Sequence, residues 1–386
     1  MKKILFTIGC LDSGGVSKSL INLLETIDKE NNEVSLFVAN PKGVMMKHVP
    51  YNVKILSNGK ISSLVAGFKG LLPLLRKGYI LLFLFSIIRI FLSRFDKGKA
   101  GLLLSRLMPR FIDERYDLIV DYNGQHMLYY MVDKLYGRKK ITFFHSDYTQ
   151  WSHYENVDCI YYPKVDGIYS ISPTCVESLK KKFPQCSDKI FLMENLILKD
   201  NIVKLSKESQ NIINPDDVNF VTLGHVCLNK GTKLAIESAY LLKQRGLKFK
   251  WYFIGQVSDE FDFLSYAKEL DVEENVIFLG RQDNPYPFLS AATLYIHPSK
   301  FEGKSIALDE AKILLKPIVV TNFSSVHDQF TDRVNASVCD MNSDSVANAI
   351  IELLEDAKLR DRYSRWLAEN ATDNLNEVRK IYKWVM

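Results

Sequence analysis

Two carboxylates eight positions apart, Glu302 and Glu310, are the side chains of this chain best suited to chemistry on a bound ligand. Glu302 stands in a Gly-containing turn, and Glu310 follows about two helical turns further on. At about 100° per residue, this spacing leaves the two side chains roughly 80° apart, on the same side of a helix. The pair could hold a hydroxyl-rich ligand at both ends while N–H groups at the helix N-terminus face a phosphate.

The residues around this pair predict the elements that position it. An apolar run at 293–297 predicts a strand that ends at Pro298. The turn follows, then a helix over about 305–315 and a second strand over 318–321. A strand, a tight turn, a helix and a strand in this order are typical of a parallel sheet, whose ligands bind at the carboxyl ends of the strands.

A chain of 386 residues is too long for one typical domain and suits two domains of about 150–200 residues. Short apolar runs alternate with helical patterns in both halves, which predicts an α/β protein built from βαβ units. The expected strands are 3–8, 33–38, 53–56, 118–121, 141–145, 167–170, 190–193, 218–223, 250–254, 276–279, 294–296 and 318–321. The expected helices include 16–27, 232–245, 259–270, 287–290, 305–315 and 343–356.

Further polar or flexible residues follow predicted strands of the first half. Gly14 and Gly15 precede a helix, and paired glycines let backbone N–H groups approach a ligand. The sequence lacks the full G-x-G-x-x-G pattern there, so dinucleotide binding is not supported. His145 ends one predicted strand, and Asp121 and Asn123 end its neighbour. We expect these side chains to lie at the ligand-binding edge of the sheet.

The order of these motifs resembles that of the retaining glycosyltransferases of family 4, whose signature is such a pair of glutamates. The resemblance covers nearly the whole chain, weakly between about residues 52 and 115. It implies the GT-B fold, in which two Rossmann-like domains face each other across a cleft and a C-terminal helix crosses back to the first domain. The corresponding boundaries are 1–200 for the acceptor-binding domain, 201–365 for the nucleotide-sugar-binding domain and 366–386 for the returning helix.

One position departs from the family pattern at the start of the second domain. Gly224 and His225 follow a predicted strand, and Lys230 comes after a short gap. The family has an Arg where His225 stands, and that Arg and the Lys hold the donor diphosphate. A histidine, with a pKa of about 6.5, is only partly charged at pH 7 and lacks the fork of Arg. Our hypothesis is that Lys304 replaces the missing cation.

The resemblance implies a role for each site residue. The catalytic residues would be His145, near the transferred sugar, and Glu302, while Glu310 would accept hydrogen bonds from the ribose hydroxyls. Asp121 and Asn123 would contact the acceptor. The other expected contacts to the nucleotide-sugar, several of them through backbone groups, come from Gly14, Gly15, Gly224, His225, Lys230, Gly280, Arg281, Gly303, Lys304, Ser305 and Ile306.

Composition narrows the class of protein further. The net charge of +5 is mild, and nucleic acid is not an expected partner. The six cysteines are scattered without a CxxC motif, which favours reduced thiols in a cytosolic protein over disulfides or a zinc site. No DxD pattern occurs in a fitting context, so we expect neither a metal nor a cofactor. The apolar run at 4–8 is too short for a signal peptide and predicts a first strand.

The segment 64–110 is both basic and apolar, with nine Lys or Arg residues and one acid, Asp96. Its densest apolar run is too short to span a bilayer, which needs about 20 residues. The mixture suits helices that lie in an anionic membrane surface, with Arg76, Lys77 and Arg89 facing lipid. The alternative is a pair of core helices with exposed basic residues.

These expectations describe a retaining glycosyltransferase that moves a sugar from a nucleotide-sugar, expected to be a UDP-sugar, to a saccharide hydroxyl. The basic segment favours a polyprenyl-diphosphate-linked acceptor and a cytoplasmic enzyme held peripherally on the inner face of the cell membrane. Such an enzyme would serve bacterial capsule or exopolysaccharide biosynthesis. Two alternatives remain open: a nucleotide-sugar epimerase with the GT-B fold, and a noncatalytic binding partner that keeps the fold.

Overall fold

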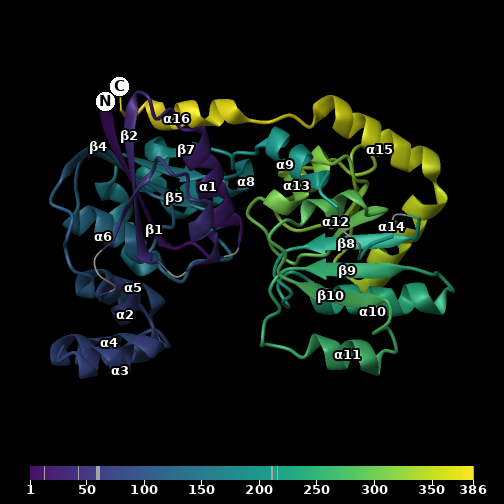
Figure 1. The fold of residues 1–386 in the computed structure, drawn as a ribbon, viewed down its shortest axis with the longest axis horizontal. Coiled ribbons are helices and arrows are strands. Elements are labelled where there is room, and N and C mark those ends of the chain that lie inside the picture. The colour runs from purple at the N-terminus through teal and green to yellow at the C-terminus, as the bar shows by residue number, and fades with distance from the viewer. Residues whose placement is uncertain (13, 42, 58–60, 210–211, 215, 386) are drawn as a thin grey trace. The chain divides into compact units, whose positions relative to one another are not determined.

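The computed structural model describes residues 1–12, 14–41, 43–57, 61–209, 212–214 and 216–385. The chain divides into two compact units, each built around its own parallel sheet (Figure 1). Unit 1 comprises Met1–Leu196 together with the residues from Leu375 onward, and unit 2 comprises Ile197–Asn374.

The parallel strands of unit 1 follow the order β3-β2-β1-β4-β5-β6-β7. They are β1 (Lys2–Cys10), β2 (Asn32–Asn40), β3 (Lys54–Leu56), β4 (Arg115–Asp121), β5 (Tyr136–Phe144), β6 (Gly167–Ser170) and β7 (Ile190–Leu192). The strand order reverses at β1, where Thr7 pairs with Phe37 of β2 and with Asp121 of β4. At such a switch point, ligands bind beyond the carboxyl ends of the strands.

Apolar side chains are buried on both faces of this sheet, because successive residues of a strand point to opposite sides. Leu5 packs into one cluster with Phe37, whereas Ile4 and Phe6 pack into another with Leu20 of α1. The helices and 3-10 turns of unit 1 outside the 61–107 region are α1 (Gly15–Thr26), η1 (Val44–His48), α6 (His126–Lys134), α7 (Glu155–Tyr161), η3 (Tyr162–Lys164), α8 (Pro173–Lys182), η4 (Pro184–Lys189), η6 (Leu375–Val378) and α16 (Arg379–Tyr382).

A group of short helices stands between β3 and β4 and forms the lower left of Figure 1. Its members are α2 (Ile61–Ala66), η2 (Phe68–Gly70), α3 (Leu71–Arg76), α4 (Ile80–Leu92) and α5 (Lys97–Leu107). Asp96 caps α5 by accepting a hydrogen bond from the Lys99 N–H at 2.8 Å. In the part of the chain that the structure describes, no helix combines the length and the apolar character that crossing a membrane requires.

The strands of unit 2 follow the order β10-β9-β8-β11-β12-β13, again all parallel. They are β8 (Asn219–Leu223), β9 (Lys250–Ile254), β10 (Val276–Gly280), β11 (Leu294–His297), β12 (Ile318–Thr321) and β13 (Ser337–Cys339). The helices and the 3-10 turn are α9 (Lys199–Ser206), α10 (Thr232–Gln244), α11 (Phe263–Glu269), α12 (Tyr286–Ser290), α13 (Ile306–Ile313), η5 (Val326–Asp328), α14 (Ser343–Glu355) and α15 (Ala357–Asn370).

The predicted fold class is confirmed: each unit is a Rossmann-like α/β domain. The final segment differs in detail from the single returning helix expected over 366–386. Residues up to Asn374, including α15, belong to unit 2, and the return to unit 1 is made by η6 and α16; Met386 lies outside the described residues. Val378 and Ile381 are buried with Ile4 and Phe6, so this segment completes the core of unit 1.

Candidate functional site

Glu302 lies in the loop between β11 and α13, where several side chains surround its carboxylate. The Lys230 ammonium donates to both carboxylate oxygens, at 2.6 and 2.7 Å. His297 Nε2 lies 2.8 Å from Oε1, and the Ser299 hydroxyl donates to the same oxygen at 2.8 Å. The Tyr295 hydroxyl is 3.1 Å from His297 Nδ1. A neutral imidazole that accepts from Tyr295 at Nδ1 donates its Nε2–H to Glu302, so every contact favours the carboxylate.

Burial by itself would raise the pKa of Glu302. The Lys230 ammonium and the hydrogen bond from His297 outweigh burial and hold the pKa well below its usual range. Glu302 is therefore ionised at neutral pH and forms a partly buried ion pair with Lys230. An ammonium has three donors, so Lys230 keeps one N–H for a second anion, such as a phosphate oxygen.

The prediction that Glu302 and Glu310 lie on the same side of one helix was wrong. The helix α13 begins at Ile306, so Glu302 stands four residues before it in an irregular loop, and helical angles do not relate it to Glu310. The Glu302 carbonyl accepts a hydrogen bond from the Ser325 hydroxyl at 2.9 Å, which holds the loop. Gly303 and the Ile306 side chain are buried, so only backbone groups of these two residues remain for a ligand.

Glu310 lies inside α13, and only 3% of its surface is exposed. The Tyr286 hydroxyl of α12 donates to its Oε1 at 3.2 Å. Charged side chains are almost never this buried without a partner or a function. Tyr286 was not predicted as a site residue, because the sequence gives no sign that α12 packs against α13.

The first turn of α13 is held by Gln329. Its Oε1 accepts from the Ser305 N–H at 3.1 Å, and its Nε2 donates to the Ser305 carbonyl and to Asp309 Oδ1, at 3.2 and 3.0 Å. Burial tends to raise the pKa of Asp309, but Lys312 and then Lys304 outweigh it and lower the pKa. Lys304 therefore places positive charge near the N-terminus of α13. Its contact with a diphosphate remains a prediction.

The loop that carries Lys230 lies close to the loop that carries Glu302. Gly231, the N-cap of α10, has a φ of 72°, and a Cβ there would lie 1.8 Å from the Pro298 carbonyl oxygen. The Lys300 N–H donates to the Asn229 carbonyl at 3.0 Å and joins the same two loops. Only glycine permits this conformation at this separation. The loop after β8 is therefore fixed against the loop after β11.

The other residues of unit 2 that were predicted to contact the nucleotide-sugar follow β8 and β10, on the same side of the strand order as β8. Gly224 follows β8, and its N–H donates to the Ile254 carbonyl at 3.0 Å, while Gly280 ends β10 with a φ of 64°. His225 is exposed. Arg281 is exposed and pairs with Asp283 at 3.3 Å, which is typical of a solvated surface residue. Roles of these residues toward a base or a diphosphate remain predictions.

In unit 1, the predicted residues gather at the carboxyl ends of β1, β4 and β5. Gly14 caps α1 with a φ of 145°, and Gly15 begins that helix. The His145 ring lies against Tyr122, with centroids 4.8 Å apart, and stacks on Phe143 at 5.7 Å. Both His145 nitrogens are buried without a hydrogen-bond partner among the described residues.

Burial lowers the pKa of His145 to about 4, and a weaker interaction with the Tyr122 backbone opposes this effect. His145 is therefore neutral at pH 7 and has one nitrogen to donate and one to accept. Buried polar atoms are nearly always paired, so an unpaired imidazole at a ligand-binding edge favours a ligand role. Its catalytic role remains a prediction.

Asp121 requires a correction. It is completely buried, and its carboxylate accepts from the Thr142 hydroxyl at 2.6 Å and from the N–H groups of Asn123 and Gly124, at 3.1 and 2.9 Å. Burial raises its pKa to about 7 despite these hydrogen bonds. Such a group shapes the loop after β4 and does not reach a ligand directly. Asn123, which is partly exposed, remains the predicted acceptor contact.

Sequence reasoning missed several residues that complete the site of unit 2. His297 and Ser299 flank Pro298 at the predicted strand end, and a His-Pro-Ser sequence directly before the turn was an available signal. Gln329 lies 24 residues after Ser305 and has no local signal. Polar residues that act on a distant loop become visible only once the strand order is known.

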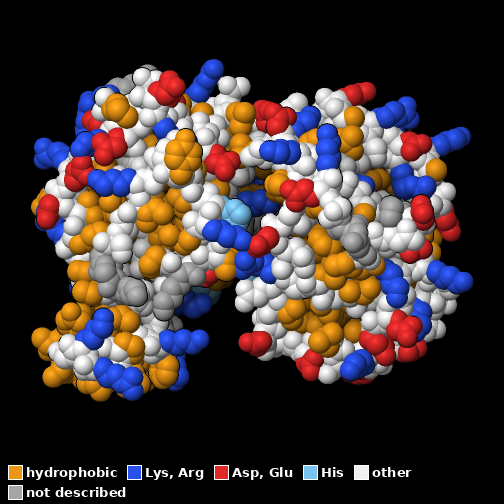
Figure 2. All heavy atoms as spheres, viewed as in Figure 1, with side chains coloured by type: hydrophobic (Ala, Val, Ile, Leu, Met, Phe, Trp, Pro, Cys, Tyr) orange, Lys and Arg blue, Asp and Glu red, His pale blue; other side chains and the backbone are white. Residues whose placement is uncertain are grey.

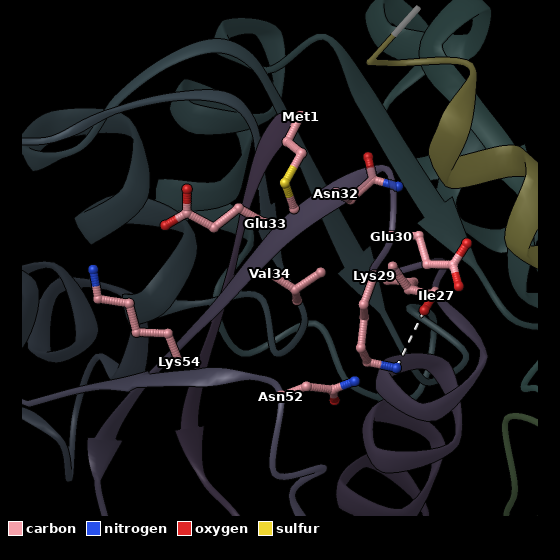
Figure 3. Close-up of a pocket in the computed structure, with 9 residues that line it drawn as sticks. All are labelled: Met1, Ile27, Lys29, Glu30, Asn32, Glu33, Val34, Asn52 and Lys54. Carbon is pink, nitrogen blue, oxygen red and sulfur yellow. Dashed lines mark hydrogen bonds between the residues drawn. The ribbon is translucent and has the colours of Figure 1, made fainter.

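A surface pocket in unit 1 lies at the opposite edge of the sheet (Figure 3). Its lining residues surround the amino ends of β1, β2 and β3 and are Met1, Ile27, Lys29, Glu30, Asn32, Glu33, Val34, Asn52 and Lys54. The Lys29 ammonium is turned back to the Ile27 carbonyl at 3.2 Å. The pocket contains none of the predicted site residues, and in open parallel sheets ligands bind at the other edge.

Comparison with known proteins supports the fold and identifies a matching family model for part of the chain. The fold is of the GT-B type, and residues 204–367 match the family model described as "Glycosyl transferases group 1". The matched stretch contains Lys230, Glu302 and Glu310. Two solved structures share the fold over 99–100% of this chain and 99% of their own: Anabaena HepE in complex with UDP-glucose (TM-score 0.70, 15% identity) and a variant of S. aureus TarM in complex with UDP (TM-score 0.72, 13% identity).

One curated relative is more similar in sequence. It is N-acetylgalactosamine-N,N'-diacetylbacillosaminyl-diphospho-undecaprenol 4-alpha-N-acetylgalactosaminyltransferase of Campylobacter jejuni, 30% identical over 229 residues. The match covers 58% of this chain and 61% of the length of that relative.

Proposed function

We propose that this protein is a retaining glycosyltransferase that moves a sugar from a nucleotide-sugar to a hydroxyl of a saccharide acceptor. The observation that carries the proposal is the ion pair between partly exposed Lys230 and buried Glu302 in the loops after β8 and β11, with buried Glu310 eight residues on. Burying the polar side chains of Glu302 and Glu310 at the carboxyl edge of a sheet costs stability, and binding a ligand there would account for it. The family match over 204–367 points to a nucleotide-sugar as that ligand.

The proposed chemistry depends on positioning and electrostatics. Lys230 and backbone N–H groups at the start of α13 would stabilise the departing diphosphate. Glu310 would hold the ribose hydroxyls, and Glu302 would lie beside the transferred sugar. The leaving phosphate would take the proton of the acceptor hydroxyl from the same face of the sugar, which retains the anomeric configuration. Neutral His145 would donate a hydrogen bond to the sugar.

We infer a UDP-sugar as the donor, because the HepE and TarM structures of the same fold were obtained with UDP or UDP-glucose. Calorimetric titration with UDP, GDP and ADP and their sugar conjugates tests this inference. Binding of the uridine series alone, lost in Glu310→Ala and kept in Glu269→Ala, is the expected result. Glu269 is an exposed glutamate at the end of α11 and is a matched control. Preference for another base would refute the donor assignment.

The acceptor is proposed to be a saccharide carried on a polyprenyl diphosphate, as the name of the Campylobacter jejuni relative states for that protein. Incubating the enzyme with its donor and a synthetic lipid-linked saccharide should give a product with the anomeric configuration of the donor sugar, read from the anomeric coupling constant in proton NMR. An inverted product would contradict the retaining mechanism. Epimerised donor formed without acceptor would favour an epimerase, and donor binding without any turnover would favour a noncatalytic partner.

We further propose that α3 and α4 lie on an anionic membrane. Large apolar side chains along this segment are exposed, and orange apolar and blue basic side chains gather there in Figure 2. They include Phe68 (75% exposed), Leu81 (70%), Phe91 (61%) and Phe95 (75%). A soluble monomer rarely exposes so many apolar side chains together. Exposed Arg76, Lys77 and Arg94 add the positive charge that anionic lipid attracts.

The membrane proposal is tested by flotation with vesicles that contain anionic lipid. Arg76→Glu, Lys77→Glu and Arg94→Glu together should abolish co-flotation. The matched control changes three exposed basic residues of unit 2, Lys248, Lys358 and Arg365, to Glu, so the net charge changes equally. Equal flotation of both triple variants would refute the proposal. Arg89 is left out because it does not face lipid.

A further inference from the structure

Arg89 is the basic residue of α4 that turns away from the exposed face. Helical spacing places it with Leu82 and Ser86, at i, i+4 and i+7. Leu82 packs against the core of unit 1, and Ser86 is completely buried. Arg89 is itself half-buried, its Nε is shielded from solvent without a hydrogen-bond partner, and burial lowers the pKa of the guanidinium. The residues described here include no carboxylate paired with it.

His126 stands at the start of α6, after β4, and is near enough to Arg89 for the guanidinium charge to act on its imidazole. Burial lowers the pKa of the His126 imidazole to about 4, and the positive charge of Arg89 adds to the effect. The imidazole packs against Gly9 at the end of β1, because a Cβ on Gly9 would lie 3.3 Å from His126 Nε2 and 3.8 Å from Asn123 Oδ1. His126 is therefore a neutral group fixed at the carboxyl edge of β1 and β4.

The positive charge of Arg89 has no negatively charged partner at this edge among the described residues. A half-buried guanidinium whose Nε lacks a partner is costly, because polar and charged groups taken out of water need a partner. Its neighbour His126 cannot supply negative charge. His145, in the next loop, also has ring nitrogens without partners. The Asp121 carboxylate at this edge is already engaged by Thr142 and by the N–H groups of its own loop. Arg89, His126 and His145 therefore remain for a ligand, and an oxyanion would complement the charge of Arg89.

We propose that Arg89 and His126 form a binding subsite in unit 1 for a phosphate oxyanion of the acceptor. This inference rests on the proposed glycosyltransferase function and deepens it. A phosphate offers oxygens to the fork of Arg89 and to an imidazole N–H at once. The outer face of the same helix carries the exposed apolar side chains, including Leu81 and Ile88. A ligand that joins a phosphate to a long apolar chain fits both faces of α4.

The subsite is tested with inorganic pyrophosphate as the probe. All proteins carry Lys230→Ala, which removes the residue proposed to hold a diphosphate in unit 2. We expect calorimetry to show that Arg89→Met weakens pyrophosphate binding at least tenfold and that Arg365→Met, at an exposed arginine of α15, leaves it unchanged. His126→Phe should also weaken binding. Equal binding by Arg89→Met and its parent would overturn the proposal.

A stability measurement separates a ligand role from a structural one. If Arg89 serves a ligand, removing its unpaired buried charge should leave the melting temperature of the ligand-free protein unchanged or raise it. A structural arginine would show a clear decrease, and that result would also overturn the proposal. Neither measurement uses turnover or UDP. Failure of the subsite is therefore distinguishable from failure of the glycosyltransferase proposal, which the UDP titration tests.

Vesicles distinguish the two sources of a lipid phosphate. Phosphatidylcholine vesicles carry either a small fraction of a polyprenyl diphosphate or a matched charge of phosphatidic acid. We expect Arg89→Met to reduce binding to the polyprenyl-diphosphate vesicles and not to the phosphatidic acid vesicles, because bulk headgroups meet the exposed basic residues of the segment. Equal loss on both would assign the subsite to bulk headgroups and overturn the assignment to the acceptor.

Discussion

At the residue scale, the central feature is the Glu302 carboxylate, whose partners contribute different interactions. Lys230 neutralises the charge of Glu302, while His297 and Ser299 fix one of its oxygens. When a diphosphate attracts Lys230, the hydrogen bonds from His297 and Ser299 would keep Glu302 ionised and in place. Preorganisation of this kind removes the need to reorganise the site during the reaction.

The ion pair makes the stability of unit 2 dependent on pH. The pKa of Glu302 is depressed in the folded state, so its contribution is present above its ordinary value of about 4.5 and is lost as pH falls below it. Glu302→Gln should cost about 1–3 kcal/mol at neutral pH, because it leaves the partly exposed Lys230 ammonium without its counter-ion. Thermal melts of both proteins should converge as pH falls from about 6 to 3. A constant difference would contradict the depressed pKa.

The stability contribution of Asp121 depends on pH in the opposite direction to that of Glu302. Its folded-state pKa is raised to about 7, so its contribution is full below its ordinary value of 3.8 and is lost as pH rises through about 7. Asp121→Asn should therefore be less stable relative to the parent protein at pH 5 than at pH 8. Melting temperatures at the two values provide the test. A difference that does not change with pH would show that Asp121 does not titrate in this range.

At the scale of elements, the loop between β8 and α10 carries the strictest backbone requirement. Gly231→Ala would place a Cβ 1.8 Å from the Pro298 carbonyl and should separate Lys230 from Glu302. Gly246→Ala is a matched control, because Gly246 has a φ of 78° with open space around it. The control should lose only about 1–3 kcal/mol of backbone strain. In urea melts, Gly231→Ala should lose clearly more stability and should also bind UDP more weakly.

The elements also show how far the sequence predicts this structure. Apolar runs located β6, β9 and β12 to the residue, because each is a buried run bounded by polar or turn residues. The strand β13 was missed because its three residues, Ser337–Cys339, form no such run. The glutamates were found from a local motif. Gln329, Tyr286 and the inward turn of Arg89 depend on packing between segments distant in sequence, which no local pattern encodes.

At the scale of the whole molecule, unit 1 is built from two separate stretches of chain. Val378, Ile381 and Val385 are buried in its core with Ile4 and Phe6, and the Tyr382 hydroxyl accepts from the Asp28 N–H at 2.8 Å. Ending the chain at Asn374 should destabilise unit 1 by roughly 1.5–3 kcal/mol for each buried apolar side chain removed. Calorimetry should show one transition lowered and that of unit 2 retained. Equal lowering of both would mean that the units unfold together.

This discontinuity has a consequence for biosynthesis. The ribosome completes all of unit 2 before it makes the residues from Leu375 onward, which unit 1 needs for its core. Unit 2 can therefore finish folding first. Until the residues from Leu375 onward are made, the face of the unit 1 sheet that carries Ile4 and Phe6 lacks part of its apolar cover. During that interval the nascent chain exposes the neighbours of Ile381 together with the apolar side chains of α3 and α4. The residues from Leu375 onward thus complete the core of a unit whose other residues were made before unit 2.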